Sequence, residues 1–182
     1  KKVETVTNYY NQVFDYPDKL KGHTLPPFEG TTLLSVNAPY KHKNLGIAIN
    51  AAKLLREQHN DFKFRFVMTV SATDFKYDFV QDPDGIADSF CLIGKVDVSE
   101  CPSLYKQADI CFQPTLLECF TATYPEAMKV GVPIVTTDIE FAKGLCGDAA
   151  KYYSPLDAQA CADAIYEVAI NSQLREQLVE AG

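Results

Sequence analysis

The sequence predicts an α/β fold: a Rossmann-like three-layer α/β/α sandwich in which helices cover both faces of a mostly parallel sheet. Two observations lead to this prediction. Apolar segments of strand length alternate with segments of helical periodicity from residue 31 onward. The strand segments are apolar on both faces, which is typical of parallel strands buried between helices. A chain of 182 residues with 47% hydrophobic residues is long enough for one well-filled domain.

Six strands are expected, each an apolar run bounded by turn-forming or polar residues. They cover residues 31–37, 62–70, 90–94, 110–114, 133–137 and 149–154. Because helical segments separate them, successive strands can return in the same direction. The loops that follow the strands and lead into helices are therefore the expected ligand-binding positions.

The helical segments are expected between these strands and at the end of the chain. They cover residues 44–58, 102–107, 124–130, about 140–145, 157–170 and 172–181. Within the first segment, four apolar residues share one face: Leu45, Ala48, Ala52 and Leu55. Gly131 is placed to end the third helix, and Pro133 to open the strand that follows.

The first 30 residues differ from the rest of the chain. Residues 3–11 have a short strand-like pattern, and residues 16–27 read as an irregular connector between Tyr16-Pro17 and Pro26-Pro27. We expect residues 1–30 to be a connector or the start of the domain, and residues 31–182 to form the domain itself. The chain begins without methionine, and we expect it to be a piece of a longer protein.

Charge and cysteine content exclude several classes of function. The net charge of −7 argues against nonspecific binding of nucleic acid or of an anionic membrane. No signal-peptide pattern and no apolar run long enough to span a bilayer are present, so we expect a soluble, cytoplasmic chain. The six cysteines form no C-x-x-C pair, which favours reduced thiols over a zinc site.

Glu118 and Glu126 lie where the fourth strand gives way to the next helix. Backbone N–H groups and the helix dipole at such a turn favour an anion such as a phosphate. The two carboxylates would repel a phosphate, so we expect them to accept hydrogen bonds from hydroxyls, as on a ribose or a sugar. A structural alternative stays open, because Thr123-x-x-Glu126 also fits a capping box. Glu118 is either exposed to solvent or used in binding.

The loop after the first strand contains Lys41, His42 and Lys43. Lys43 is placed to pair with a phosphate, although a solvated basic loop would give the same pattern. His42 has no partner apparent in the sequence, and we interpret it as an exposed loop residue. Asp97, Asp109, Asp138 and Asp148 lie at strand ends and turns without D-x-D spacing among them, which favours a metal-independent site. No P-loop and no G-x-G-x-x-G motif follows a strand, which argues against a P-loop ATPase and a nicotinamide-binding domain.

Several motifs occur in one order along most of the chain. They are Val36-x6-Lys43-Asn44-Leu45, Gly94-x-Val96, Leu104-Tyr105-x-x-Ala108-Asp109, Pro114-x-x-x-Glu118-x-Phe120-x5-Glu126-Ala127-Met128-x-x-Gly131-x-Pro133-Ile134-Val135-x-Thr137, Gly147-Asp148-Ala149-Ala150 and Ser154-Pro155-x-Asp157. In this order they resemble the C-terminal donor-binding domain of glycosyltransferase family 4 (group 1). Enzymes of that family retain anomeric configuration and have the two-domain GT-B fold, of which this chain would be one half.

The resemblance implies a hexosyltransferase that moves a hexose from a nucleoside-diphosphate sugar to an acceptor hydroxyl, in polysaccharide, lipopolysaccharide or glycoconjugate synthesis. It implies that Glu118 positions the donor sugar and that Lys43 stabilises the diphosphate leaving group, the two catalytic roles. Glu126 would bind the ribose. The other implied donor-binding residues are Phe120, Thr121, Ala122 and Thr123, through their backbone amides, and Val96, near the base.

The resemblance also implies the partners of the domain. They are a nucleotide-sugar donor and an N-terminal acceptor domain that is absent from this sequence, with no metal or other cofactor, no nucleic acid and no membrane contact by this fragment. Without the acceptor domain we expect binding but not transfer, while the full-length protein could associate with a membrane. Two alternatives are another GT-B enzyme, such as a sugar-nucleotide epimerase or a phosphorylase, and a noncatalytic α/β interaction module.

Overall fold

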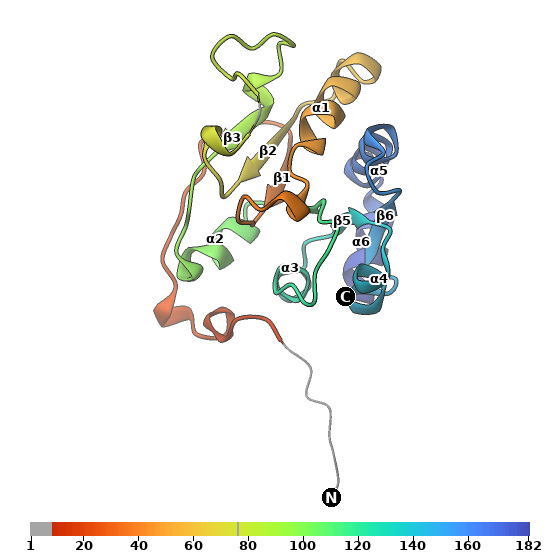
Figure 1. Cartoon of the computed structure of the whole chain (residues 1–182). Helices are drawn as coiled ribbons and strands as arrows, with labels where there is room; N and C mark the ends of the chain where they lie inside the picture. Colours follow the sequence, from red (N-terminus) through yellow and green to blue (C-terminus); the bar gives the residue numbers. More distant parts are fainter. Residues whose placement is uncertain (1–8, 76) are drawn as a thin grey trace, which may run out of the picture.

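A computed structural model describes residues 9–75 and 77–182 and contains a six-stranded sheet whose neighbouring strands are all parallel (Figure 1). The strands are β1 (Thr31–Ser35), β2 (Phe64–Met68), β3 (Phe90–Leu92), β4 (Ile110–Gln113), β5 (Ile134–Thr137) and β6 (Ala150–Tyr153). Their spatial order is β3-β2-β1-β4-β5-β6. Each strand lies within the range predicted for it, and the Rossmann-like α/β fold is confirmed.

Helices flank the sheet on both faces. They are α1 (Ile47–Gln58), α2 (Cys101–Tyr105), α3 (Thr123–Val130), α4 (Glu140–Cys146), α5 (Ala158–Ile170) and α6 (Ser172–Ala181). One buried cluster combines the sheet with α1, α5 and α6, and a second combines it with α2, α3 and α4. None of the described helices is both long and apolar enough to cross a membrane.

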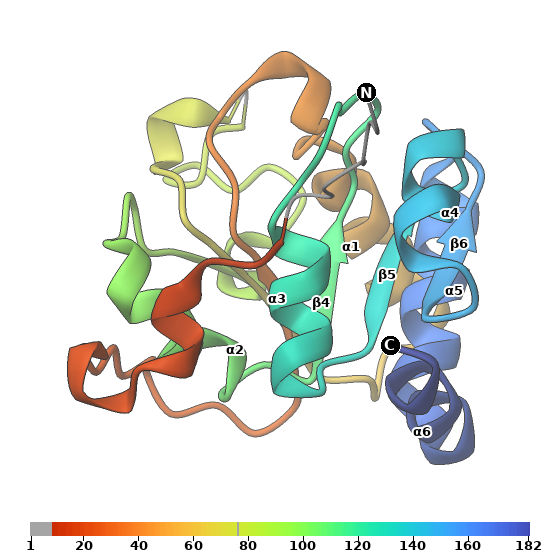
Figure 2. The ribbon, with the colours of Figure 1, turned by 90° about the horizontal axis from the view of Figure 1, so that it is seen from below.

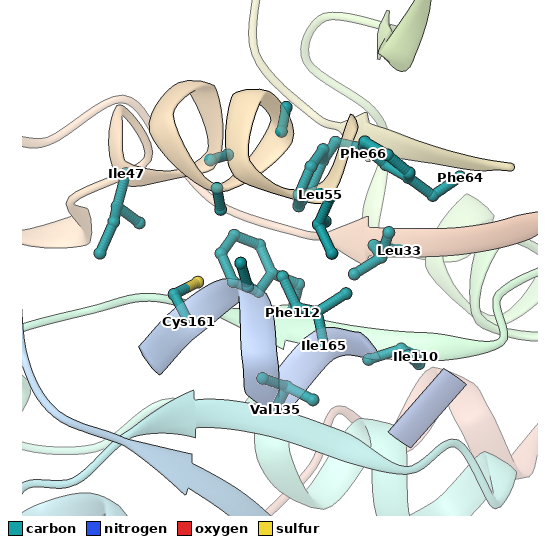
Figure 3. Packing of buried hydrophobic residues seen from close by; sticks show 14 of the residues in the cluster. Leu33, Ile47, Leu55, Phe64, Phe66, Ile110, Phe112, Val135, Cys161 and Ile165 are labelled. Atoms are coloured by element: carbon teal, nitrogen blue, oxygen red, sulfur yellow. The ribbon is translucent and has the colours of Figure 1, made fainter. Parts of the chain in front are cut away.

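Successive residues of the central strands supply the two clusters in turn, because side chains along a strand point to opposite faces. On β1, Leu33 faces α1 and α5, whereas Leu34 faces the opposite layer. On β4, Phe112 and Cys111 divide in the same way. Figure 3 shows Phe112 between the sheet and the helices that carry Leu55 and Ile165. This double burial explains why the strand segments are apolar on both faces.

The first helix begins later than the sequence predicts. Residues 41–43 form a 3-10 turn (Lys41–Lys43), and Asn44 then adopts a left-handed conformation with a φ of 50°. The α-helix starts only at Ile47. Lys43 therefore lies in a separate turn ahead of the helix. Asn is one of the few residues besides glycine that adopt this conformation regularly, and nothing in the periodicity reveals it.

The N-terminal segment packs against the layer formed by α2 and α3. Most of the strand-like pattern predicted for residues 3–11 lies outside the described residues, and residues 9–11 are not in a strand. A 3-10 turn (Gln12–Asp15) follows, and Asp15 forms an ion pair of 2.8 Å with Lys129 on α3. Figure 2 shows this red segment running past α3. The connector over residues 16–27 is irregular apart from a short turn (Pro17–Lys19), as predicted.

The order of the strands determines where a ligand is expected. The chain leaves β1 through α1 towards β2 on one side, and leaves β4 through α3 towards β5 on the other. Because β1 and β4 are neighbours, the connections diverge between them and leave a crevice at their carboxyl ends. In open parallel sheets, ligands bind at this switch point.

Candidate functional site

A cavity of about 640 Å³ lies at the carboxyl end of the sheet. Its walls come from the loops after β1, β2, β3 and β4 and from the start of α2. They contribute residues 36–40, His42, Lys43, Thr69, Lys95, Val96, Val98, Cys101 and Glu118. Val96 lines the cavity as part of the loop that follows β3, together with Lys95. Of the residues predicted for the site, Lys43, Val96 and Glu118 are therefore brought together.

Lys43 and Glu118 form an ion pair across the crevice between β1 and β4. Only 13% of the lysine side chain and 12% of the glutamate side chain are exposed. Thr115 adds a second contact, since its hydroxyl donates to Glu118 Oε1 at 3.2 Å. The alternative of a solvated basic loop does not describe Lys43, because its ammonium group is paired and mostly buried. Lys41, in the same turn, is exposed.

Backbone hydrogen bonds join the two loops that carry this pair. The carbonyl oxygen of His42 accepts from the backbone N–H of Leu116 at 2.7 Å, and the oxygen of the Thr115 hydroxyl lies 3.3 Å from it. The imidazole of His42 stacks on the ring of Tyr40, and its Nε2 lies 4.0 Å from Glu118 Oε1. His42 is partly exposed, as expected, but it also lines the cavity beside Glu118.

Buried polar residues lie at the ends of β1, β2 and β4, and two of them, Asn37 and Thr69, line the cavity. Asn37 and Gln113 exchange side-chain hydrogen bonds of 2.6 and 3.1 Å, although they are 76 residues apart in the chain. Asn37 also donates to Ser35 Oγ at 2.9 Å and exchanges two bonds with Thr69. None of these residues was among those that the sequence predicts for the site. The polar Gln113 at the end of an apolar strand was the one signal that could have revealed them.

The loop from Phe120 to Thr123 leads directly into α3. The helix begins at Thr123 with Ala122 in the capping position and without a side-chain capping bond. The capping box considered for Thr123 and Glu126 is therefore wrong, because the Thr123 hydroxyl instead accepts from Thr121 Oγ1 at 3.1 Å. Within residues 9–75 and 77–182, the backbone N–H groups of Phe120, Thr121 and Ala122 have no hydrogen-bond acceptor. They resemble the free amides that favour anions at a helix N-terminus.

Glu126 lies apart from the Lys43–Glu118 pair. It is 6% exposed and does not line the cavity. The hydroxyl of Tyr105 lies 3.3 Å from Glu126 Oε2, and the backbone N–H of Asn11 lies near the carboxylate. Burial raises the pKa of Glu126, although both of these groups oppose this rise. The N-terminal segment thus covers a carboxylate that the sequence places in the site.

Tyr40 separates this cavity from a second one of about 660 Å³, which lies between α1 and the loop after β2. Lys41 and Lys53 line this second cavity, and Lys53 forms an ion pair of 2.8 Å with Asp84. The two lysines of the basic turn therefore face different cavities. Because of this separation, a variant of Lys41 is a suitable control for a variant of Lys43 in ligand-binding experiments.

All six cysteines are free thiols in the structure. Burial raises the pKa of four of them, Cys101, Cys111, Cys146 and Cys161. Cys119, next to Glu118, is exposed. Within residues 9–75 and 77–182, no group of three or more His, Cys, Asp or Glu side chains is arranged to hold a metal ion.

Comparison of the sequence with models of known protein families gave a match to one family. The sequence model described as "Glycosyl transferases group 1" matches residues 18–182. A comparison with curated protein sequences gave no significant match.

Solved structures share the fold at low sequence identity. Sucrose-phosphate synthase from Thermosynechococcus elongatus is 17% identical with a TM-score of 0.68, over 95% of this chain and 43% of that one. WaaG, a glycosyltransferase involved in lipopolysaccharide biosynthesis, is 18% identical with a TM-score of 0.68, over 93% and 44%. The C-terminal domain of a group 1 protein (LpcC) from Francisella tularensis is 19% identical with a TM-score of 0.62, over 93% and 87%.

The chain thus spans less than half of the first two of these structures, but most of the isolated domain.

Proposed function

The chain belongs to the glycosyl transferases of group 1, and from this premise we propose that it is the donor-binding domain of a retaining, family 4 hexosyltransferase. In this proposal a nucleoside-diphosphate sugar lies in the cavity at the carboxyl ends of β1 and β4. The observation that carries it is the pairing of Lys43 with Glu118 across the switch-point crevice. A cation and a carboxylate there match the phosphate and the hydroxyl groups of one ligand.

Lys43 is proposed to contact the diphosphate. Its ammonium group lies in a crevice that is partly shielded from water, where a charge interaction is stronger than at an open surface. The amides of residues 120–122, which have no acceptor within residues 9–75 and 77–182, and the N-terminus of α3 support the same role. Together they would stabilise the negative charge that develops on the departing nucleoside diphosphate. Asp97, Asp109, Asp138 and Asp148 lack the D-x-D spacing that would hold a divalent cation against a diphosphate, so we propose metal-independent stabilisation.

Glu118 is proposed to position the donor sugar. In the structure its carboxylate is bonded to Lys43 and Thr115. Movement of Lys43 towards a diphosphate would free the carboxylate to accept hydrogen bonds from sugar hydroxyls. Val96, on the opposite wall of the cavity, is proposed to lie near the base.

Glu126 is proposed to bind the ribose, and this role requires a rearrangement. The carboxylate is buried beneath the segment that contains Asn11, so a ribose can reach it only after that segment moves. An ion pair between Asp15 and Lys129 holds the segment at two partly exposed side chains. Exposed ion pairs contribute only about 0–1 kcal/mol, so this contact does not prevent such a movement.

Transfer is proposed to need a second domain that holds the acceptor. The chain covers 43% of sucrose-phosphate synthase and 44% of WaaG, but 87% of the isolated C-terminal domain of LpcC. These proportions support a C-terminal donor half, with residues 18–182 matching the group 1 family. The role of WaaG in lipopolysaccharide biosynthesis supports a similar class of acceptor, a polysaccharide, lipopolysaccharide or other glycoconjugate.

Calorimetric titration of the chain with UDP, GDP and ADP tests this proposal. We expect at least one of the three to bind, because all three carry the diphosphate and the ribose that the proposed contacts involve. The nucleoside with the same base is the matched control. It lacks the groups that Lys43 and the α3 amides would hold, and we expect it to bind at least about tenfold more weakly, as for one lost charge-assisted contact.

The absence of binding by all three nucleotides, in a sample whose circular dichroism shows a folded α/β protein, would contradict the donor-site assignment. Equal affinity for the nucleoside and the nucleoside diphosphate would contradict the role of Lys43 and the amides in particular.

A further inference from the structure

His42 is the second basic side chain beside the carboxylate of Glu118. Its Nε2 lies 4.0 Å from Glu118 Oε1, the same oxygen that receives Lys43 and the Thr115 hydroxyl. The separation is longer than a hydrogen bond, but a protonated imidazole at this distance would form an ion pair. His42 is also more accessible than the lysine, with 41% of its side chain exposed.

Neighbouring groups hold the imidazole at this position. The His42 carbonyl accepts from the backbone N–H of Leu116 at 2.7 Å, which joins its backbone to the loop that carries Glu118. On the other side, the imidazole ring lies nearly parallel to the ring of Tyr40, with centroids 5.6 Å apart and an interplanar angle of 12°. Both contacts place His42 next to Glu118, and neither involves Lys43.

A diphosphate in the cavity would compete with Glu118 for Lys43. If Lys43 turns to the phosphate, Glu118 keeps only the Thr115 hydroxyl, although its side chain is 12% exposed. Leaving a largely buried carboxylate without a cation is unfavourable. Two other lysines are close in the fold, but Lys41 lines the neighbouring cavity and Lys95 belongs to the wall after β3. Within the described part of the chain, neither forms an ion pair with Glu118.

We propose that His42 replaces Lys43 as the ion-pair partner of Glu118 when Lys43 moves to the nucleotide. Donor binding is then accompanied by protonation of His42. This inference rests on the proposed function and adds to it a positioning residue that keeps Glu118 fixed beside the sugar. The charged groups that face His42 are Glu118 and Lys43 in the joined loops, with Lys41 adjacent in its own turn and Lys95 across the cavity.

The direction of the pH dependence follows from this exchange. An imidazole in water has an ordinary pKa of about 6.5 and is therefore mostly neutral at about pH 7.5. The complex favours the protonated form because it faces an unpaired carboxylate. Binding therefore takes up a proton, and by linkage the affinity for the nucleotide decreases as the pH rises through this range.

Calorimetry at about pH 7.5 in PIPES, HEPES and Tris measures this proton uptake, because the three buffers differ in ionisation enthalpy. The titrant is whichever of UDP, GDP and ADP binds the wild-type chain. We expect the wild type to take up roughly half a proton or more per nucleotide beyond the value for His42→Gln, which has no titrating ring. His59→Gln is the control, since His59 stacks on Tyr166 away from the cavity, and it should behave as the wild type does.

Equal proton uptake by the wild type and His42→Gln overturns the inference, provided that both bind nucleotide. If no nucleotide binds the wild type, the proposed function itself fails. His42→Asn serves in place of the glutamine variant if that variant melts early. The proton resonances of the His42 ring in the wild type give a second measurement, since their titration midpoint should move to higher pH in the complex and should stay in place if His42 is only structural.

Discussion

Replacing Lys43 by alanine is expected to weaken nucleoside-diphosphate binding by about 10- to 100-fold. A hydrogen bond to a charged group contributes about 1.5–3 kcal/mol, and each 1.4 kcal/mol corresponds to a factor of ten in affinity. Lys43 reaches the crevice between β1 and β4, where its side chain is 13% exposed and solvent screening is reduced. Calorimetric titration of the variant with the nucleotide that binds the wild type measures the loss.

Lys41→Ala is the matched control for this variant. Lys41 lies in the same 3-10 turn and carries the same charge, but it is exposed and faces the second cavity. We expect less than about a twofold change in affinity, as for a screened surface charge. If both alanine variants lose affinity equally, the turn acts only through its net charge and Lys43 has no specific contact.

The Lys43 variant also leaves Glu118 without its cation, so stability must be measured separately from affinity. Thermal unfolding of Lys43→Ala, Glu118→Gln and the double variant separates the two effects. Removing the carboxylate as well should recover the stability lost with the lysine alone, because no unpaired charge then remains in the crevice. Nucleotide affinity should stay low in the double variant, since the phosphate contact is still missing.

Phe112→Ala is expected to lower the free energy of unfolding by about 3–5 kcal/mol, the range for a buried phenylalanine truncated in a core. Phe112 is fully buried on the central strand β4 and lies in the cluster beneath α1 and α5 (Figure 3). Its ring packs edge-on against Phe66 on β2, with centroids 5.3 Å apart. Truncation removes these contacts and leaves a cavity. Urea unfolding followed by circular dichroism measures the change.

Ile170→Ala provides the comparison, because Ile170 ends α5 with 62% of its surface exposed. Its replacement should change the free energy of unfolding by no more than about 0.5 kcal/mol. A similar cost for both variants would mean that β4 is not packed between two helical layers.

The sequence allowed the sheet to be predicted well, because double burial gives each strand a continuous apolar run. Strand ends were less certain, since apolar residues such as Val36 continue past the last ladder bond to line the cavity. The start of α1 was predicted three residues early, at Asn44. That residue takes a left-handed conformation, which depends on local backbone geometry and leaves no mark on hydrophobic periodicity.

The site was predictable in part for the same physical reasons. Lys43 and Glu118 follow strands that ended up as neighbours, so the loop positions alone brought them to one edge of the sheet. The contact between His42 and Glu118 spans two loops far apart in sequence, and so does the Asn37–Gln113 pair. The cover over Glu126 comes from the N-terminal segment, whose packing has no local signal. Only the folded arrangement reveals such long-range contacts.

The crystal structure of the chain with its bound nucleoside diphosphate tests the central claim most directly. We expect the diphosphate at the carboxyl ends of β1 and β4, within hydrogen-bonding distance of Lys43 Nζ and of the amides of residues 120–122, with Lys43 drawn away from Glu118. A nucleotide bound elsewhere, for example in the cavity beside Lys41 and Lys53, with the Lys43–Glu118 pair intact, would contradict the account.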